Sequence, residues 1–339
     1  MITEQSRRQT DDVSDVITDV DAHKRPFYML LRKGDSCPAK IMNYDATEVE
    51  DGAFGGVIIK DVTEFKHAGR VPMNAHTMWF QETYGVSTES MVFKDPAMKG
   101  NNEVGWQRLR ASKRFNRSIE RALLSNMEAV SGDNTTTPDR TRGAIMWLSD
   151  TAQSVTGALL PVPASHRPAA NYAGTLAAFD ETALVEKIRL ASEQMQDSID
   201  LQAFLGSKLK ANLDNMSVYV PEKSGNVAAR RINWDGKAGM AITRAVSVFQ
   251  TGAGVVTAHV TYDLYRDPLT GLQTDYSSRS GIFIEPDLWE LRAAPAGKPG
   301  LFKELEDKGG GARGFIRACL MLVCRTPKGQ FRALISADT

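Results

Sequence analysis

The clearest pattern of apolar and polar positions predicts one long amphipathic helix, from about Asn101 to Ala129. Apolar residues recur there at spacings near three to five and form one face: Val104, Leu109, Phe115, Ile119, Leu123 and Met127. Asn101 or Asn102 can cap its start, and Ser131-Gly132 is expected to end it. About 28 residues at 1.5 Å each span roughly 40 Å. We therefore expect a structural spine that crosses a whole domain.

Before this helix, the pattern predicts a β-hairpin with a glycine-rich tip. Short alternating runs within residues 39–43 and 57–65 flank Gly52, Gly55 and Gly56. A phosphate-binding loop would need its glycines between a strand and a helix, followed by Lys and Ser or Thr. The run GAFGGVIIK continues into a strand instead, so the hairpin is favoured.

After the long helix, helices and strands are mixed without regular alternation. The predicted elements are a strand at 144–148, helices at 181–195 and 201–213, and strands from residue 216 onward with turns at Thr251–Gly254 and Thr326–Gly329. Such an order indicates an α+β fold and argues against a doubly wound sheet.

Composition and charge narrow the class of protein. The chain has 339 residues, and Lys plus Arg equals Asp plus Glu at 41 each. A freely soluble DNA-binding domain would usually be basic, whereas a neutral chain suits a subunit that packs against its own copies. No apolar run approaches the ~20 residues that span a bilayer. The sparse, odd set of three cysteines fits a reducing cytoplasm.

The polar face of the long helix is strongly basic. It carries Arg108, Arg110, Lys113, Arg114, Arg117 and Arg121. This stripe could meet an acidic neighbour or packaged DNA, or it could be a solvated face with local pairs such as Arg117 and Glu120. We favour the solvated face or a subunit contact, because no aromatic interleaving or base-reading motif accompanies the stripe.

The sequence offers little that points to catalysis or to a cofactor. The five histidines are scattered, and Cys319 and Cys324 fall on one predicted strand with opposite faces. His259 and Asp263 lie in a strand-like run that keeps them apart. We therefore expect a non-enzymatic protein with no catalytic residues, no metal site and no cofactor.

A series of short motifs, in this order, resembles the major capsid proteins of tailed bacteriophages. The motifs are Pro26-Phe27 after a polar arm, Asn74, Val86-Ser87-Thr88, the helix end Glu120–Asn126, Arg142-Gly143 with Trp147, and Glu285–Trp289 followed by Leu291-Arg292 and two closing strands. Arg25 stands where the family commonly has Thr, and Tyr44-Asp45 where it often has Trp. The resemblance covers most of the chain and is weak between about Val155 and Ser217.

The resemblance implies the Johnson fold that tailed-phage capsid proteins share with herpesvirus shell floors and encapsulins. The implied parts are an N-terminal arm (1–32), an extended hairpin or E-loop (33–75), a peripheral domain with the spine helix (76–175), an axial domain (176–307), and closing strands of the peripheral domain (308–339), expected as a hairpin. The short arm leaves no room for a large N-terminal scaffolding domain, so a separate scaffold protein or none is expected.

The implied function is self-assembly as hexamers and pentamers into an icosahedral shell around double-stranded DNA, with assembly in the host cytoplasm. The expected interface residues are Pro26, Phe27, Gly52, Gly55, Gly56, Arg110, Arg114, Arg117 and Arg121. The implied partners are other copies of the chain, packaged DNA contacted non-specifically, and candidate scaffold, portal and decoration proteins, with no membrane. Lys60 and Lys66 are available for the Lys–Asn cross-link of some relatives, although nothing in the sequence supports that reaction. Two alternatives stay open, an encapsulin-like compartment and a non-enzymatic nucleic-acid-binding protein.

Overall fold

The computed structural model describes most of the chain. The described residues are 26–47, 69–92, 103–133, 135–155, 158–216, 246–266, 274, 276–295, 297, 303–305 and 311–335. Several sequence predictions lie outside them: most of the polar arm, the glycine-rich tip, Lys60 and Lys66, the cap at Asn101 or Asn102, and the strand expected just after residue 216.

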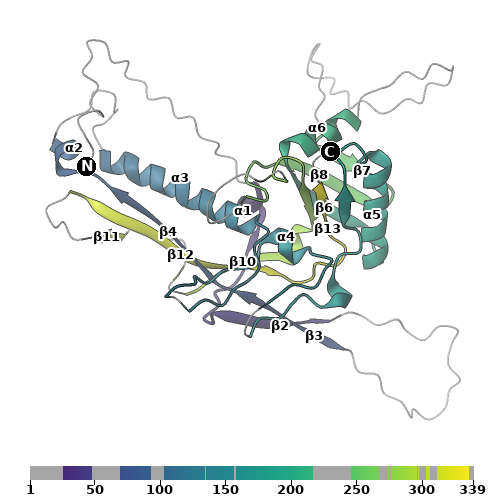
Figure 1. Cartoon of the computed structure of the whole chain (residues 1–339), viewed down its shortest axis with the longest axis horizontal. Coiled ribbons are helices and arrows are strands. Elements are labelled where there is room, and N and C mark those ends of the chain that lie inside the picture. The colour runs from purple at the N-terminus through teal and green to yellow at the C-terminus, as the bar shows by residue number, and fades with distance from the viewer. Residues whose placement is uncertain are drawn as a thin grey trace, which may run out of the picture.

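Two sheets and one long helix form the body of the molecule (Figure 1). The five-stranded sheet contains β1 (Arg32–Lys33), β10 (Trp289–Ala293), β12 (Arg313–Cys324), β11 (Lys303–Leu305) and β4 (Met78–Gly85), which pairs with β12. The six-stranded sheet runs in the order β5 (Tyr172–Gly174), β13 (Phe331–Ile335), β9 (Gly281–Ile284), β6 (Ile199–Leu205), β8 (Gly254–Val260) and β7 (Val248–Gln250). This mixture of helices and sheets confirms the predicted α+β class.

The base of the predicted hairpin is present as a separate two-stranded sheet. Strand β2 (Ile41–Thr47) pairs antiparallel with β3 (Arg70–His76), in a register that places Asn43 opposite Asn74. Met73 and Ala75 are buried against the core of the body, so the base of the hairpin is fixed. The second strand was expected within residues 57–65, which lie outside the described residues, and the described pairing involves Arg70–His76.

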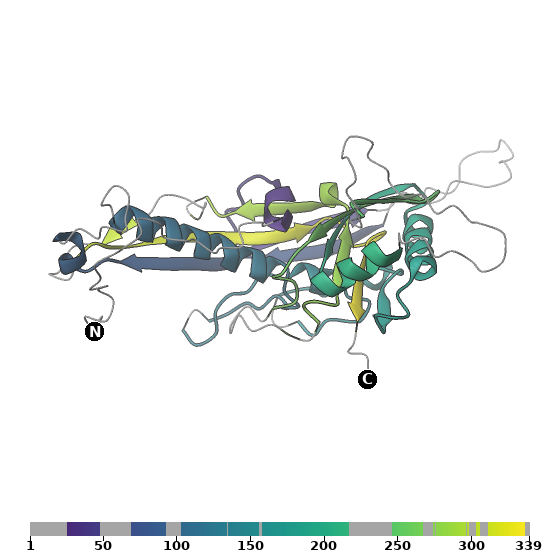
Figure 2. The ribbon, with the colours of Figure 1, turned by 90° about the horizontal axis from the view of Figure 1, so that it is seen from above.

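The spine is α3 (Glu103–Leu123), which runs along β4 and β12 (Figures 1 and 2). Its 21 residues are fewer than predicted, and Gly132 does not end it. After Leu123 the chain leaves the helix, because the Met127 carbonyl accepts from the Gly143 amide at 2.9 Å and Val130 forms a bridge with Arg140. These partners lie outside the helix and override its propensity.

Two more sequence assignments were wrong, and both segments are buried. Residues 144–148, expected as a strand, contain the short helix α4 (Ala144–Trp147). Residues 201–205, expected as the start of a helix, belong to β6, which pairs with β8 on one side and β9 on the other. A segment buried on all sides has a continuous apolar run, so its periodicity does not separate helix from strand.

The two last strands do not form the closing hairpin that the resemblance suggested. Strand β12 pairs with β4, β10 and β11, whereas β13 pairs with β9 and β5 in the other sheet. The predicted turn at Thr326–Gly329 is present, and Gly329 has φ +71°. The turn therefore passes the chain from one sheet to the other, and residues 311–335 contribute a strand to each.

The remaining helices cover the six-stranded sheet or close the ends of the body. The predicted helix α5 (Glu181–Met195) is confirmed, and the Asp180 side chain caps it by accepting from the Ala183 amide at 2.8 Å. Helices α5 and α6 (Ser207–Met216) lie over this sheet in Figure 1. The other short elements are α1 (Pro26–Leu30), α2 (Thr88–Val92) and two single turns at Ala164–His166 and Pro286–Leu288.

Candidate assembly surface

Helix α1 fixes the point where the N-terminal arm leaves the body. The Glu120 carboxylate of α3 accepts hydrogen bonds from the backbone amides of Phe27 at 3.2 Å and Tyr28 at 2.7 Å. The ring of Phe27 packs edge-on against Phe204 and Trp289. A buried carboxylate at the start of a helix satisfies amides that have no partner within the helix. Phe27 is thus completely buried in the core of its own chain, and the predicted anchor at Pro26-Phe27 acts within the chain.

The second half of the basic stripe surrounds one carboxylate. The Nε atoms of Arg117, Arg121 and Arg266 lie 3.5, 3.0 and 3.3 Å from Oδ1 of Asp263. The expected local pair between Arg117 and Glu120 is not the arrangement found, because Glu120 is turned into the core. The acidic partner comes instead from the segment after β8, far away in the sequence. This cluster therefore ties the spine to the six-stranded sheet.

The first half of the stripe reaches across to the five-stranded sheet. Arg108 donates to the Tyr84 hydroxyl at 3.1 Å and forms an ion pair with Glu304. Arg114 lies 3.5 Å from Glu82. The acidic partners of Arg108 and Arg114 thus come from β11 and β4, whereas the sequence predicted pairs local to the helix.

The expected interface residues therefore differ in how far contacts within the chain engage them. Arg117 and Arg121 are ion-paired within the chain, while Arg114 keeps about half of its side chain exposed. Arg110 lies over the ring of Trp106, 5.1 Å from its centroid. The glycines of the hairpin tip lie outside the described residues.

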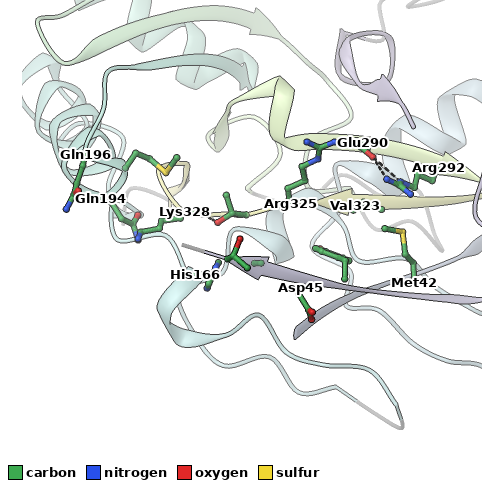
Figure 3. Close-up of a pocket in the computed structure, with 15 residues that line it drawn as sticks. Met42, Asp45, His166, Gln194, Gln196, Glu290, Arg292, Val323, Arg325 and Lys328 are labelled. Carbon is green, nitrogen blue, oxygen red and sulfur yellow. Dashed lines mark hydrogen bonds and ion pairs between the residues drawn. The ribbon is translucent and has the colours of Figure 1, made fainter. Parts of the chain in front are cut away.

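A hollow of about 850 Å³ opens between the hairpin base, the end of α5 and the ends of β10 and β12 (Figure 3). Its lining includes Met42, Tyr44, Asp45, His166, Gln194, Met195, Glu290, Arg292, Arg325 and Lys328. Arg292 lies 2.8 Å from the Glu290 carboxylate, and Arg325 contacts it from the other side. Burial acts to raise the pKa of Glu290, but the hydrogen bonds from the two arginines outweigh it and lower that pKa. The carboxylate is held as a structural anion, which makes it a poor general acid or base.

The sequence analysis did not single out Glu290, although a charged residue in the apolar run of β10 was a usable signal. The neighbouring Tyr44 hydroxyl donates to the Cys324 carbonyl at 2.6 Å and joins the hairpin to β12. Burial raises the pKa of Tyr44 well above its ordinary value. The hollow thus lies beneath a firmly attached hairpin base.

A second buried polar group lies at the other end of the hairpin base. His76 is fully buried, and its Nδ1 lies 2.7 Å from the Thr77 carbonyl, which makes Nδ1 the donor. Its Nε2 is 3.8 Å from Asp139, which also binds Lys40 at 2.8 Å. Burial lowers the pKa of His76, and the Thr77 and Asp139 contacts only partly oppose this. The histidine is accordingly neutral near pH 7.

Neither the cysteines nor any cluster of possible metal ligands points to a reactive site in the described part of the chain. Cys37, Cys319 and Cys324 are buried and unbridged, and burial raises the pKa of Cys319 and Cys324. Within the described ranges, no three acidic, histidine or cysteine side chains gather as they would around a metal ion. The helices in those ranges are all too short or too polar to cross a bilayer.

Comparison with known structures identifies the fold. The chain is similar to one from the capsid of the native GTA particle (TM-score 0.59, 13% identity, 98% of this chain and 97% of that chain). It is also similar to one from the capsid of cyanophage P-SCSP1u (TM-score 0.57, 10% identity, 98% and 94%) and to one from Gordonia phage Cozz (TM-score 0.56, 12% identity, 97% and 92%). The fold is therefore the phage major capsid fold that the resemblance implied.

Sequence comparison assigns the family. No curated protein matches the chain in sequence. The family model described as "SU10 major capsid protein" matches residues 1–333. This match does not favour the encapsulin or nucleic-acid-binding alternatives. Because it spans nearly the whole chain, the protein belongs to the SU10 major capsid protein family.

Proposed function

We propose that copies of this chain assemble as hexamers and pentamers into a closed icosahedral shell that encloses double-stranded DNA. The observation that carries the proposal is the family match over residues 1–333. Similar chains form the capsids of the native GTA particle and of cyanophage P-SCSP1u, which supports an assembled shell of many copies. Assembly would take place in the host cytoplasm.

The shape of the chain suits contacts with several neighbours at once. The spine, β4 and β12 form one elongated limb, and the hairpin base lies along another side of the body (Figures 1 and 2). Asn74 fastens the hairpin by donating to the Ala158 carbonyl and accepting from the Leu160 amide, both at 3.0 Å. Because the base of the hairpin is fixed, a contact made by the hairpin with a neighbouring copy would also hold the body of the chain. Closed symmetry then multiplies contacts that are individually weak.

Within this assembly we assign separate roles to the parts of the chain. The limb with the spine would be the peripheral domain, and the six-stranded sheet with α5 and α6 would form the axial domain at the five- and six-fold axes. Arg110 and Arg114 would contact neighbours, together with the glycine-rich hairpin tip. Arg117 and Arg121 would support those contacts from within the chain, because Asp263 engages them.

The direct test is negative-stain electron microscopy of the full chain expressed alone, after size-exclusion chromatography. Closed shells, or rings with five- and six-fold symmetry, are the expected result. A chain that remains monomeric at every concentration, both alone and with the proteins encoded beside it, would refute self-assembly.

DNA enclosure needs a separate measurement on particles from the producing host. We expect double-stranded DNA that resists nuclease until the particles are opened. Particles filled with an enzyme and free of DNA would refute this part of the proposal and would favour the alternative of an encapsulin-like compartment.

A further inference from the structure

One face of the five-stranded sheet is not covered by the spine helix. Cross-strand pairs on β4 and β12 point to this side: Trp79 with Cys319, Gln81 with Arg317 and Thr83 with Phe315. Lys303 and Leu305 of β11 pair with Phe315 and Arg313 and share the same side. We call these residues the uncovered sheet face, namely Trp79, Gln81, Thr83, Lys303, Leu305, Arg313, Phe315 and Arg317.

The charges of these strands are divided between the two faces. The acidic residues of β4 and β11, Glu82 and Glu304, lie on the helix side and pair with Arg114 and Arg108. Strand β12 has no acidic residue. The uncovered sheet face therefore carries three cationic side chains and no carboxylate from β4, β11 or β12.

The same face is also apolar. Trp79 is 52% exposed and Leu305 is 50% exposed. The Arg317 guanidinium lies 5.9 Å from the Trp79 ring centroid and 4.7 Å from that of Phe315, and it donates to the Gln81 side chain at 2.9 Å. The exposed Trp79 ring and the half-buried Phe315 ring hold an arginine in place, and such a surface fits a partner with both apolar groups and negative charge. The phosphate backbone of duplex DNA would neutralise the cations but leave the apolar surface exposed.

The chain itself contains a segment with the complementary composition. Residues 9–22, QTDDVSDVITDVDA, hold five aspartates and no lysine or arginine. Between the aspartates stand four aliphatic residues, Val13, Val16, Ile17 and Val20. This short segment thus combines negative charges, which complement the cations of the uncovered sheet face, with aliphatic side chains, which can cover its apolar surface.

We propose that the uncovered sheet face binds the acidic segment 9–22 of a second copy of this chain. This rests on the proposed assembly, which brings copies into contact. Helix α1 is held against α3 through Glu120, so Pro26, the first described residue, lies on the helix side of its own sheet. The 25 residues before α1 reach up to about 80 Å when extended, far enough for the limb of a neighbouring copy.

Photo-cross-linking in assembled particles tests the proposal. The full chain carrying Thr83→p-benzoylphenylalanine places the probe on the uncovered sheet face, and Leu109→p-benzoylphenylalanine places a control on the exposed side of α3. Particles assembled from isotopically light and heavy chains distinguish links within a copy from links between copies. We expect position 83, but not position 109, to link to residues 9–22 of another copy.

Charge variants then ask whether the attraction is specific. Arg317→Glu, with Arg313→Glu, should lower the arm cross-link about tenfold, since each pair contributes little but reversal replaces attraction by repulsion. An arm with its five aspartates changed to Asn should lose less, because it removes the attraction without adding repulsion, and the combined variant should lose no more than this arm variant. Arg189→Glu on α5, another exposed ion-paired arginine, should leave the cross-link unchanged.

Several results would overturn the proposal. Links from position 83 to DNA, to the same copy's arm or to another surface of a neighbour would each do so, as would particles without any link. Failure of the unmodified chain to form particles would instead refute the proposed function, so the two failures are distinguishable.

Discussion

Removal of the Glu120 carboxylate is the sharpest test of how the arm is anchored. Glu120 is 1% exposed and accepts from the amides of Phe27 and Tyr28, which lie 93 and 92 positions earlier in the chain, respectively. Because Phe27 and Tyr28 stand in the first turn of α1, their amides have no acceptor within the helix. The carboxylate therefore determines whether α1 remains docked on the spine.

The expected loss of stability follows from these two bonds. A hydrogen bond to a charged group contributes about 1.5–3 kcal/mol, and two bonds sum to about 3–6 kcal/mol. Removal of a buried charge also removes its desolvation cost, which offsets part of this loss. We expect Glu120→Ala to lower the free energy of unfolding by about 3–5 kcal/mol. Glu120→Gln, which keeps one acceptor, should cost about 1–3 kcal/mol.

The assay is denaturant unfolding of the unassembled chain, followed by tryptophan fluorescence. Glu186→Ala on α5 is the matched control, because it also removes a helix glutamate, but one in an exposed pair with Arg189; it should leave the midpoint unchanged within error. If Glu120→Ala unfolds at the same denaturant concentration as the control, the anchoring role of the carboxylate is refuted.

Three further changes test other parts of the fold. Arg142→Met should lower the free energy of unfolding by about 3–5 kcal/mol, measured by thermal unfolding. The change leaves the carboxylate of Glu128, which lies 2.6 Å from Arg142, without its buried partner. A loss of stability smaller than that caused by replacing a surface arginine would contradict this. Burial lowers the pKa of His76, so its stabilising contribution is complete above the ordinary histidine pKa of about 6.5 and is lost as the pH falls through the lower pKa of the folded state. His76→Gln should therefore reduce the acid-side slope of stability against pH by up to about 1.4 kcal/mol per pH unit, and an unchanged slope would argue against a neutral buried histidine. Gly329→Ala should cost about 2 kcal/mol, because φ is +71° and a Cβ would lie 2.0 Å from Cγ of Met195; calorimetry that shows no loss would contradict this.

The sequence was most informative where one face of an element meets water. The spine was predictable because Phe115 and Ile119 recur on one side of a largely polar helix. Helix α5 was predictable for the same reason, and its cap at Asp180 is a local interaction. The turns at Thr251–Gly254 and Thr326–Gly329 were predictable from residues that favour reversals.

The errors arose where distant partners decide the structure. The end of the spine depends on pairing with residues 140–143, and β6 was mistaken for a helix because strands on both sides bury it. The turn residues before β13 predicted that the chain reverses direction. They did not predict that β13 pairs with β5 and β9 and not with β12.

The sequence alone thus determined the α+β class, the spine and, by the order of its motifs, the capsid family. Only the tertiary structure decided that Glu120 anchors α1 and that Asp263 gathers three arginines. It also decided which side of the five-stranded sheet the spine helix leaves uncovered. The physical reason is range: helix periodicity and turn chemistry act over a few residues, whereas these polar contacts join residues tens to hundreds of positions apart.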